Sequence, residues 1–111
     1  MCQDKHPEIA EQRNCIEVSQ ILPILNLDQQ ARVLDIGCGV GRWADAIPQE
    51  ISYYLGCDFS EQMVEIAISR NQKNNFNFAV VSAMEIEQYC KQQNIPAFSH
   101  VIISGVFNVF K

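Results

Sequence analysis

The sequence predicts an α/β fold in which a parallel sheet carries helices on both faces. Short apolar segments alternate with amphipathic segments, the pattern of strands joined by right-handed helical crossovers. The first apolar segment, residues 33–36, runs into a glycine-rich turn and then a helix, which is typical of a nucleotide-binding unit. Near the end of the chain, Val101, Ile102 and Ile103 are apolar at successive positions, so we expect both faces of that strand to be buried.

The composition is that of an ordinary globular protein. Of 111 residues, 48% are hydrophobic and 19% are charged, and the net charge is -5. Lys and Arg together number 8 and form no basic run, so nothing in the sequence supports a nucleic-acid partner. Five cysteines without a C-x-x-C pair indicate reduced thiols in the cytoplasm and no metal site. No apolar run approaches the ~20 residues that span a bilayer, so we expect no membrane partner.

Three glycines at alternate positions, Gly37, Gly39 and Gly41, form the turn after the first strand. Glycine permits unusual backbone angles and lets a ligand approach the main chain closely. A dinucleotide fingerprint, G-x-G-x-x-G, would place its third glycine where this chain has Arg42. Asp35 stands two residues before the first glycine, where dinucleotide sites are usually apolar. The alternative is a turn without a ligand, which the cost of burying an acid makes less favoured.

An acid followed by G-x-G-x-G resembles the first motif of the class I S-adenosylmethionine-dependent methyltransferases, whose fold is a Rossmann-like sheet. The resemblance implies that S-adenosylmethionine is the cofactor. It also implies that Asp35 orders the turn and faces the methionine end, while Gly37, Gly39 and Gly41 let the backbone lie against the cofactor. Cys38 lies in the same turn, and we interpret it as a small apolar filler rather than a nucleophile.

The second predicted strand, residues 51–57, stops at Asp58, which lies 17 residues after Gly41. Ligands of parallel sheets bind outside the carboxyl ends of the strands. A carboxylate at this place can accept hydrogen bonds from both ribose hydroxyls. The alternative is an acid that only caps the following helix, and the spacing from the glycine turn favours the ribose role.

The stretch that begins at Asp58 resembles the family's next motif, an acid followed by x-S-x-x-M. Ser60 is a suitable N-cap for a helix over residues 61–70. The resemblance implies that Phe59 lies beside the ribose and that Met63 packs on the adenine. A helical methionine is more commonly an ordinary core residue, and the two roles are compatible.

The third predicted strand, residues 76–81, is followed by Ser82, Ala83 and Met84 and then by a polar helix over residues 85–93. The family usually carries an acid here that accepts a hydrogen bond from the adenine amino group. This chain has Ser82 in its place. The Ser82 hydroxyl can still accept one hydrogen bond, and the amide of Ala83 or Met84 can reach a ring nitrogen.

Two further helices are predicted around the first strand. Residues 8–22 form an amphipathic helix that Pro23 interrupts or ends. Within it, Arg13 is a candidate for the methionine carboxylate, although a solvated side chain is the favoured interpretation. A second helix over residues 40–48 follows the glycine turn.

The fourth predicted strand covers residues 98–104. His100 is at its start, the wrong end for the cofactor crevice, so we expect a structural or solvated residue and not a general base. Ser104 ends the strand on the cofactor side and is included among the predicted cofactor-binding residues. The positions that follow are candidates for the acceptor side: Gly105, Phe107 and Asn108.

The family fold has seven strands in the order 3-2-1-4-5-7-6, of which this chain supplies 3-2-1-4. We therefore expect a single domain over residues 1–111 that is truncated after the fourth strand. It comprises an N-terminal helical region, residues 1–30, and a βα core, residues 31–111. An unpaired fourth strand favours self-association. The fragment alone is expected to be inactive.

The function predicted from these motifs is methyl transfer from S-adenosylmethionine to an unidentified acceptor, expected to be a small molecule. No residue stands out as a catalytic base. One alternative is a non-catalytic module that binds S-adenosylmethionine or a partner. Another is a nicotinamide-binding domain, against which Asp35 and Arg42 argue.

Overall fold

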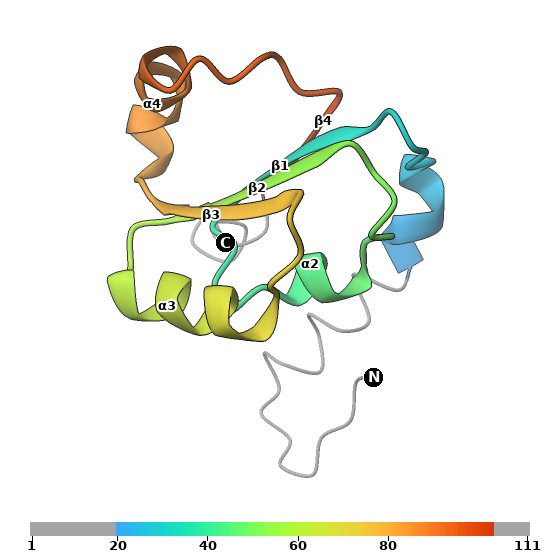
Figure 1. Cartoon of the computed structure of the whole chain (residues 1–111), viewed down its shortest axis with the longest axis horizontal. Coiled ribbons are helices and arrows are strands. Elements are labelled where there is room, and N and C mark those ends of the chain that lie inside the picture. Colours follow the sequence, from blue (N-terminus) through green and yellow to red (C-terminus); the bar gives the residue numbers. More distant parts are fainter. Residues whose placement is uncertain (1–19, 104–111) are drawn as a thin grey trace, which may run out of the picture.

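The computed structural model describes residues 20–103, which form a four-stranded sheet (Figure 1). The strand order is β3-β2-β1-β4, and each neighbouring pair is parallel. The predicted fold class and strand order are therefore confirmed. The strands are β1 (Arg32–Ile36), β2 (Tyr53–Asp58), β3 (Phe76–Val80) and β4 (His100–Ile103).

Helices lie on both faces of the sheet. In Figure 1, α2 (Arg42–Ala46) and α3 (Glu61–Arg70) lie on one side, and α4 (Ile86–Gln92) lies on the other. A short 3-10 helix, η1 (Ala83–Glu85), leads into α4. The helix α3 has the predicted bounds, whereas α2 is shorter than the predicted 40–48 because Gly41 has a φ of 93°, outside the helical region.

Each face of the sheet carries its own apolar core. Alternate residues of a strand point to opposite faces, so neighbouring β1 residues belong to different cores. The core under α2 includes Val33, Trp43, Tyr54 and Phe76. The core under α4 includes Leu34, Leu55, Cys57 and Ile86. Because β1 and β2 are buried on both faces, they are held firmly in the sheet. The candidate site is built from the carboxyl ends of these two strands.

The strand β4 is less covered than the sequence predicted. Ile102 is buried, but Val101 is 55% exposed and Ile103 is 50% exposed. The expectation that both faces are buried is wrong for these two residues, because no helix among residues 20–103 packs over them. Within that range the outer edge of β4 also has no paired strand, and self-association through it stays a prediction.

Residues 20–25 are helical. The last of them, Leu25, contacts the start of β4. The helix continues through Pro23 to Leu25, so the predicted end near Pro23 is wrong. Leu22 and Leu25 pack against the core under α2, which offsets the hydrogen bond that proline cannot make. The Nε2 atom of His100 donates to the Leu25 carbonyl at 2.8 Å, which confirms the structural role of this histidine. No helix in the described part of the chain is long and apolar enough to cross a membrane.

Candidate cofactor-binding site

The glycine turn joins the end of β1 to the start of α2. All three glycines have positive φ values, 76° at Gly37, 57° at Gly39 and 93° at Gly41. Residues with a Cβ rarely adopt these angles, so the backbone itself requires glycine here. The prediction that the turn needs unusual angles is confirmed.

The glycines differ in what lies beside them. A Cβ added to Gly39 would meet no atom within 4 Å, whereas one added to Gly41 would lie 3.5 Å from the Cβ of Ala67 in α3. The distance at Gly41 is an ordinary van der Waals contact, so it is the positive φ that requires glycine there. Gly39 borders open space, which is the arrangement that a ligand lying along the main chain requires.

Asp58, the last residue of β2, is hydrogen-bonded to the glycine turn. Its Oδ2 atom accepts from the Gly39 amide at 2.9 Å, and its Oδ1 atom accepts from the Ser60 amide at 3.0 Å. A carboxylate oxygen has two lone pairs, so each can accept a second hydrogen bond from a ligand hydroxyl. The structure thus brings together the two motifs that the sequence singled out.

The second motif opens α3 as predicted. The Ser60 hydroxyl accepts from the Met63 amide at 3.3 Å, which confirms the predicted N-cap. Phe59 is 81% exposed and Met63 is 39% exposed. Both apolar side chains therefore remain available beside Asp58, at the carboxyl edge of the sheet.

The segment after β3 lies at the same edge, because β3 pairs with β2 up to Asp58. Ser82 is half-buried and precedes η1, and Ala83 and Met84 lie within η1. The Met84 side chain is 92% exposed. This segment leaves apolar and hydrogen-bonding groups next to the second motif.

Asp35 is placed differently from the prediction. It is fully buried, and its Oδ2 atom accepts a hydrogen bond of 2.6 Å from the Tyr54 hydroxyl. The carboxylate therefore does not face the crevice, although its place in β1, two residues before Gly37, lets it order the turn. Sequence reasoning missed Tyr54, because no local pattern shows which residue of β2 reaches an acid of β1.

The cysteines near the turn are inert fillers, as expected. Cys38 and Cys57 are buried free thiols. Burial raises the pKa of the Cys38 thiol and brings the pKa of Cys57 to about 12. Neither is a thiolate at neutral pH, and the thiolate is the nucleophilic form.

Several predicted positions lie outside the described residues. They are the proposed cofactor contact at Ser104, the candidate carboxylate ligand Arg13, and the acceptor-side positions Gly105, Phe107 and Asn108. Most of the predicted 8–22 helix also lies outside them.

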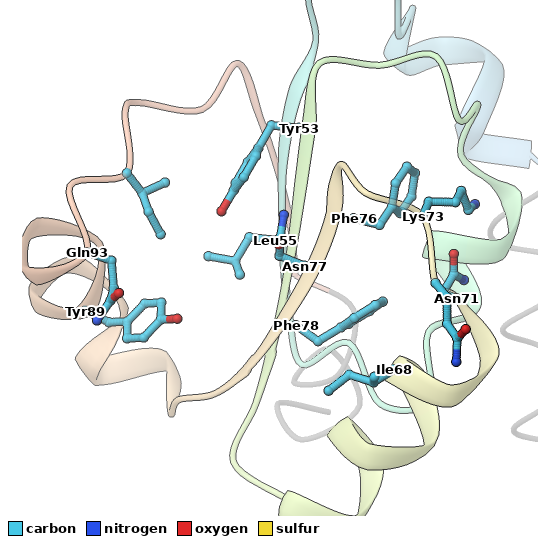
Figure 2. Close-up of a pocket in the computed structure, with 12 residues that line it drawn as sticks. Tyr53, Leu55, Ile68, Asn71, Lys73, Phe76, Asn77, Phe78, Tyr89 and Gln93 are labelled. Carbon is cyan, nitrogen blue, oxygen red and sulfur yellow. The ribbon is translucent and has the colours of Figure 1, made fainter.

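A pocket of about 600 Å³ lies elsewhere, around the strand β3 (Figure 2). Figure 2 shows Tyr53, Leu55 and Tyr89 on one side of this strand and Phe78 and Ile68 on the other. None of the predicted site residues lines it. It is thus separate from the glycine turn and from Asp58.

A family model described as a methyltransferase domain matches residues 33–111 of the chain. The match begins in β1 and includes the glycine turn, Asp58 and the segment after β3. It covers well over half of the chain, and so it establishes the family.

Individual relatives are similar over shorter stretches. A "Probable 18S rRNA (guanine-N(7))-methyltransferase" of Dictyostelium discoideum is 39% identical over 51 residues, which are 46% of this chain and 18% of the relative. Magnesium protoporphyrin IX methyltransferase of Synechocystis, solved with bound S-adenosylmethionine, has a TM-score of 0.59 at 22% identity over 91% of this chain and 50% of its own. A Listeria monocytogenes protein assigned to the S-adenosylmethionine-dependent methyltransferases has a TM-score of 0.52 at 27% identity over 62% and 30%.

One set of expectations, concerning partners, is corrected by these relatives. A small-molecule acceptor and the absence of a nucleic-acid partner conflict with the similarity to a methyltransferase named for ribosomal RNA. The net charge of -5 did not indicate a nucleic-acid acceptor. The chain spans only 18% of that relative, so its composition says little about the surface that meets the acceptor.

The family match and the fold agree with the family that the sequence motifs indicate. The sheet order was predicted from the resemblance, and the glycine turn and the acid at the end of β2 from the residues themselves, and each is present. The predicted family is confirmed, together with S-adenosylmethionine as the cofactor of its members. The chain belongs to the class I S-adenosylmethionine-dependent methyltransferases.

Proposed function

We propose that this chain binds S-adenosylmethionine across the carboxyl edge of β1 and β2 and serves the methylation of guanine N7 in an RNA. The observation that carries the cofactor site is the contact between Asp58 and the Gly39 amide, beside open space where a Cβ would lie. An acid, a main-chain cradle and apolar side chains then lie together at one edge of the sheet. These are the groups that a ribose, an amino-acid tail and an adenine require.

The described residues divide the cofactor between them in this proposal. Asp58 accepts hydrogen bonds from the ribose hydroxyls, and the main chain at Gly39 lies along the methionine part. Phe59 and Met63 cover the ribose and the adenine. The remaining proposed contacts come from the turn and the β3 end: Gly37, Cys38, Gly41, Ser82, Ala83 and Met84. Asp35 acts from beneath the turn, and Ser104 stays a proposed contact outside the described residues.

The acceptor is proposed from the relative that is named for 18S rRNA and for guanine N7. When bound, S-adenosylmethionine supplies an electrophilic methyl group on a positively charged sulfur. Guanine N7 carries a lone pair and no proton, so its methylation needs no general base. The sequence motifs include no convincing base, which is compatible with this chemistry, in which positioning of the reactants supplies much of the rate.

The cofactor part is tested by calorimetric titration with S-adenosylmethionine and with its demethylated product, with NAD as the control ligand. We expect binding of the first two alone. Binding of NAD without a response to S-adenosylmethionine would contradict the assignment.

The acceptor part is tested with the full protein, labelled S-adenosylmethionine and two versions of one ribosomal RNA. One version contains guanine, and the other contains 7-deazaguanine, which lacks N7. We expect label only in the first. Equal labelling of both RNAs would exclude guanine N7 while leaving the cofactor site intact.

A further inference from the structure

A buried hydrogen bond joins β1 and β2 next to the glycine turn. The Tyr54 hydroxyl donates to Oδ2 of Asp35 at 2.6 Å, and neither residue has any exposed surface. This length is typical of a hydroxyl that donates to a carboxylate. Because a buried carboxylate is costly without such a donor, Tyr54 stabilises Asp35 in its position.

The surrounding residues are arranged to permit this contact. Asp35 pairs in the sheet with Gly56, and Tyr54 lies two residues earlier in β2, so it shares the same face. A Cβ at Gly56 would lie 2.8 Å from the Tyr54 hydroxyl, so glycine there makes room for it. The Tyr54 ring stacks on Phe76 with 4.9 Å between centroids and meets Phe78 edge-on. These contacts hold the hydroxyl toward Asp35.

Only Ile36 separates Asp35 from the glycine turn, which continues along the end of β2. The amides of Gly37 and Cys38 both donate to the Cys57 carbonyl, at 2.7 and 3.0 Å. Because the turn is anchored to β2 and only one residue separates it from Asp35, a change in the backbone at Asp35 would alter how the turn presents Gly39.

We propose that Tyr54 is a positioning residue for the cofactor, whose hydroxyl holds Asp35 and thereby keeps the glycine turn in the conformation that S-adenosylmethionine requires. This inference rests on the proposed function, since it presupposes that the turn binds the cofactor. Tyr54 is fully buried, so it acts through Asp35 and not by contact with the ligand.

Three titratable groups, Tyr54, Cys38 and Cys57, interact electrostatically with Asp35. Burial and the charge of Asp35 raise the pKa of Tyr54 well above its ordinary value. Burial also raises the pKa of the Cys38 and Cys57 thiols. All three groups stay protonated at neutral and mildly acidic pH, so Tyr54 remains a donor. Asp58 also lies near the turn, but it is the same in every variant compared below.

The test is the Tyr54→Phe substitution, which removes the hydroxyl alone. We expect the Kd for S-adenosylmethionine to rise about tenfold. Calorimetric titration at neutral pH measures the Kd. Tyr53→Phe is the matched control, since Tyr53 contacts Phe98 and Arg32 instead, and it should leave the Kd unchanged.

A second background keeps the proposal falsifiable if Tyr54→Phe does not fold. Replacing both residues removes the Tyr54 hydroxyl together with its acceptor, so we compare Asp35→Ala with Asp35→Ala/Tyr54→Phe. Equal Kd values for these two support the proposal. A further loss in the double variant, or a folded Tyr54→Phe protein with the parental Kd, overturns it. A parent that does not bind S-adenosylmethionine overturns the proposed function as well.

Discussion

Asp58 and Gly39 are 19 residues apart in the chain, yet the Asp58 carboxylate accepts a hydrogen bond of 2.9 Å from the Gly39 amide. The acid proposed to hold the ribose therefore also holds the turn proposed to hold the methionine part. The two halves of the candidate site share one carboxylate, and a change at Asp58 should be felt by both.

Asp58→Ala should weaken S-adenosylmethionine binding by about 1.5–3 kcal/mol, since it removes charge-assisted hydrogen bonds to the ligand. Asp58→Asn should weaken it less, because the amide keeps one acceptor oxygen. Calorimetry gives both affinities, and circular dichroism checks that the fold survives. Parental affinity in Asp58→Ala would show that the ribose assignment is wrong.

Gly39→Ala and Gly41→Ala should separate binding from stability. At Gly39 the new methyl group meets no protein atom, so we expect cofactor binding to be lost at a cost in stability of about 1–2 kcal/mol for the left-handed backbone. At Gly41 the methyl group makes only an ordinary contact with Ala67, but the φ of 93° lies further from the left-handed region that other residues tolerate, so we expect a larger loss of stability. Urea unfolding and calorimetry measure the two effects. Undiminished cofactor binding by Gly39→Ala would mean that no ligand occupies the open space.

Ser82→Asp should restore the adenine acceptor that this chain lacks. We expect tighter binding of S-adenosylmethionine but little change for an analogue without the adenine amino group, because the gain requires that donor. Ser52→Asp, at an exposed position before β2, controls for the added charge. An equal gain for both ligands would place Ser82 away from the adenine.

Stability should fall at alkaline pH because of the buried thiols. Burial raises the pKa of Cys57 from its ordinary value of 9.0 to about 12. The contribution of this raised pKa to the free energy of unfolding is fully present below pH 9 and is lost as the pH rises toward 12. In that range the Cys57 thiol ionises readily only in the unfolded chain. Urea unfolding at a series of alkaline pH values should show this decline, and Cys57→Ala should reduce it. An unchanged slope in the variant would assign the decline to other groups.

Local signals predicted much of this structure. Ser60 and the apolar spacing after it gave the bounds of α3, and three glycines with an acid before them located the turn. Contacts between distant strands were not predictable in the same way. Nothing in the sequence near Asp35 shows that Tyr54 reaches it, and the exposure of Val101 depends on which elements cover β4.

The strand order has a consequence for synthesis of the chain. β1 lies between β2, which follows it closely in the sequence, and β4, which is the last strand described. Because a chain emerges from the ribosome from its N-terminus, β1 can pair on one side early but must wait for residues 100–103 on the other. During that interval the nascent protein exposes an apolar strand edge, which is a template for association. Recruitment of a chaperone while translation proceeds is the expected protection.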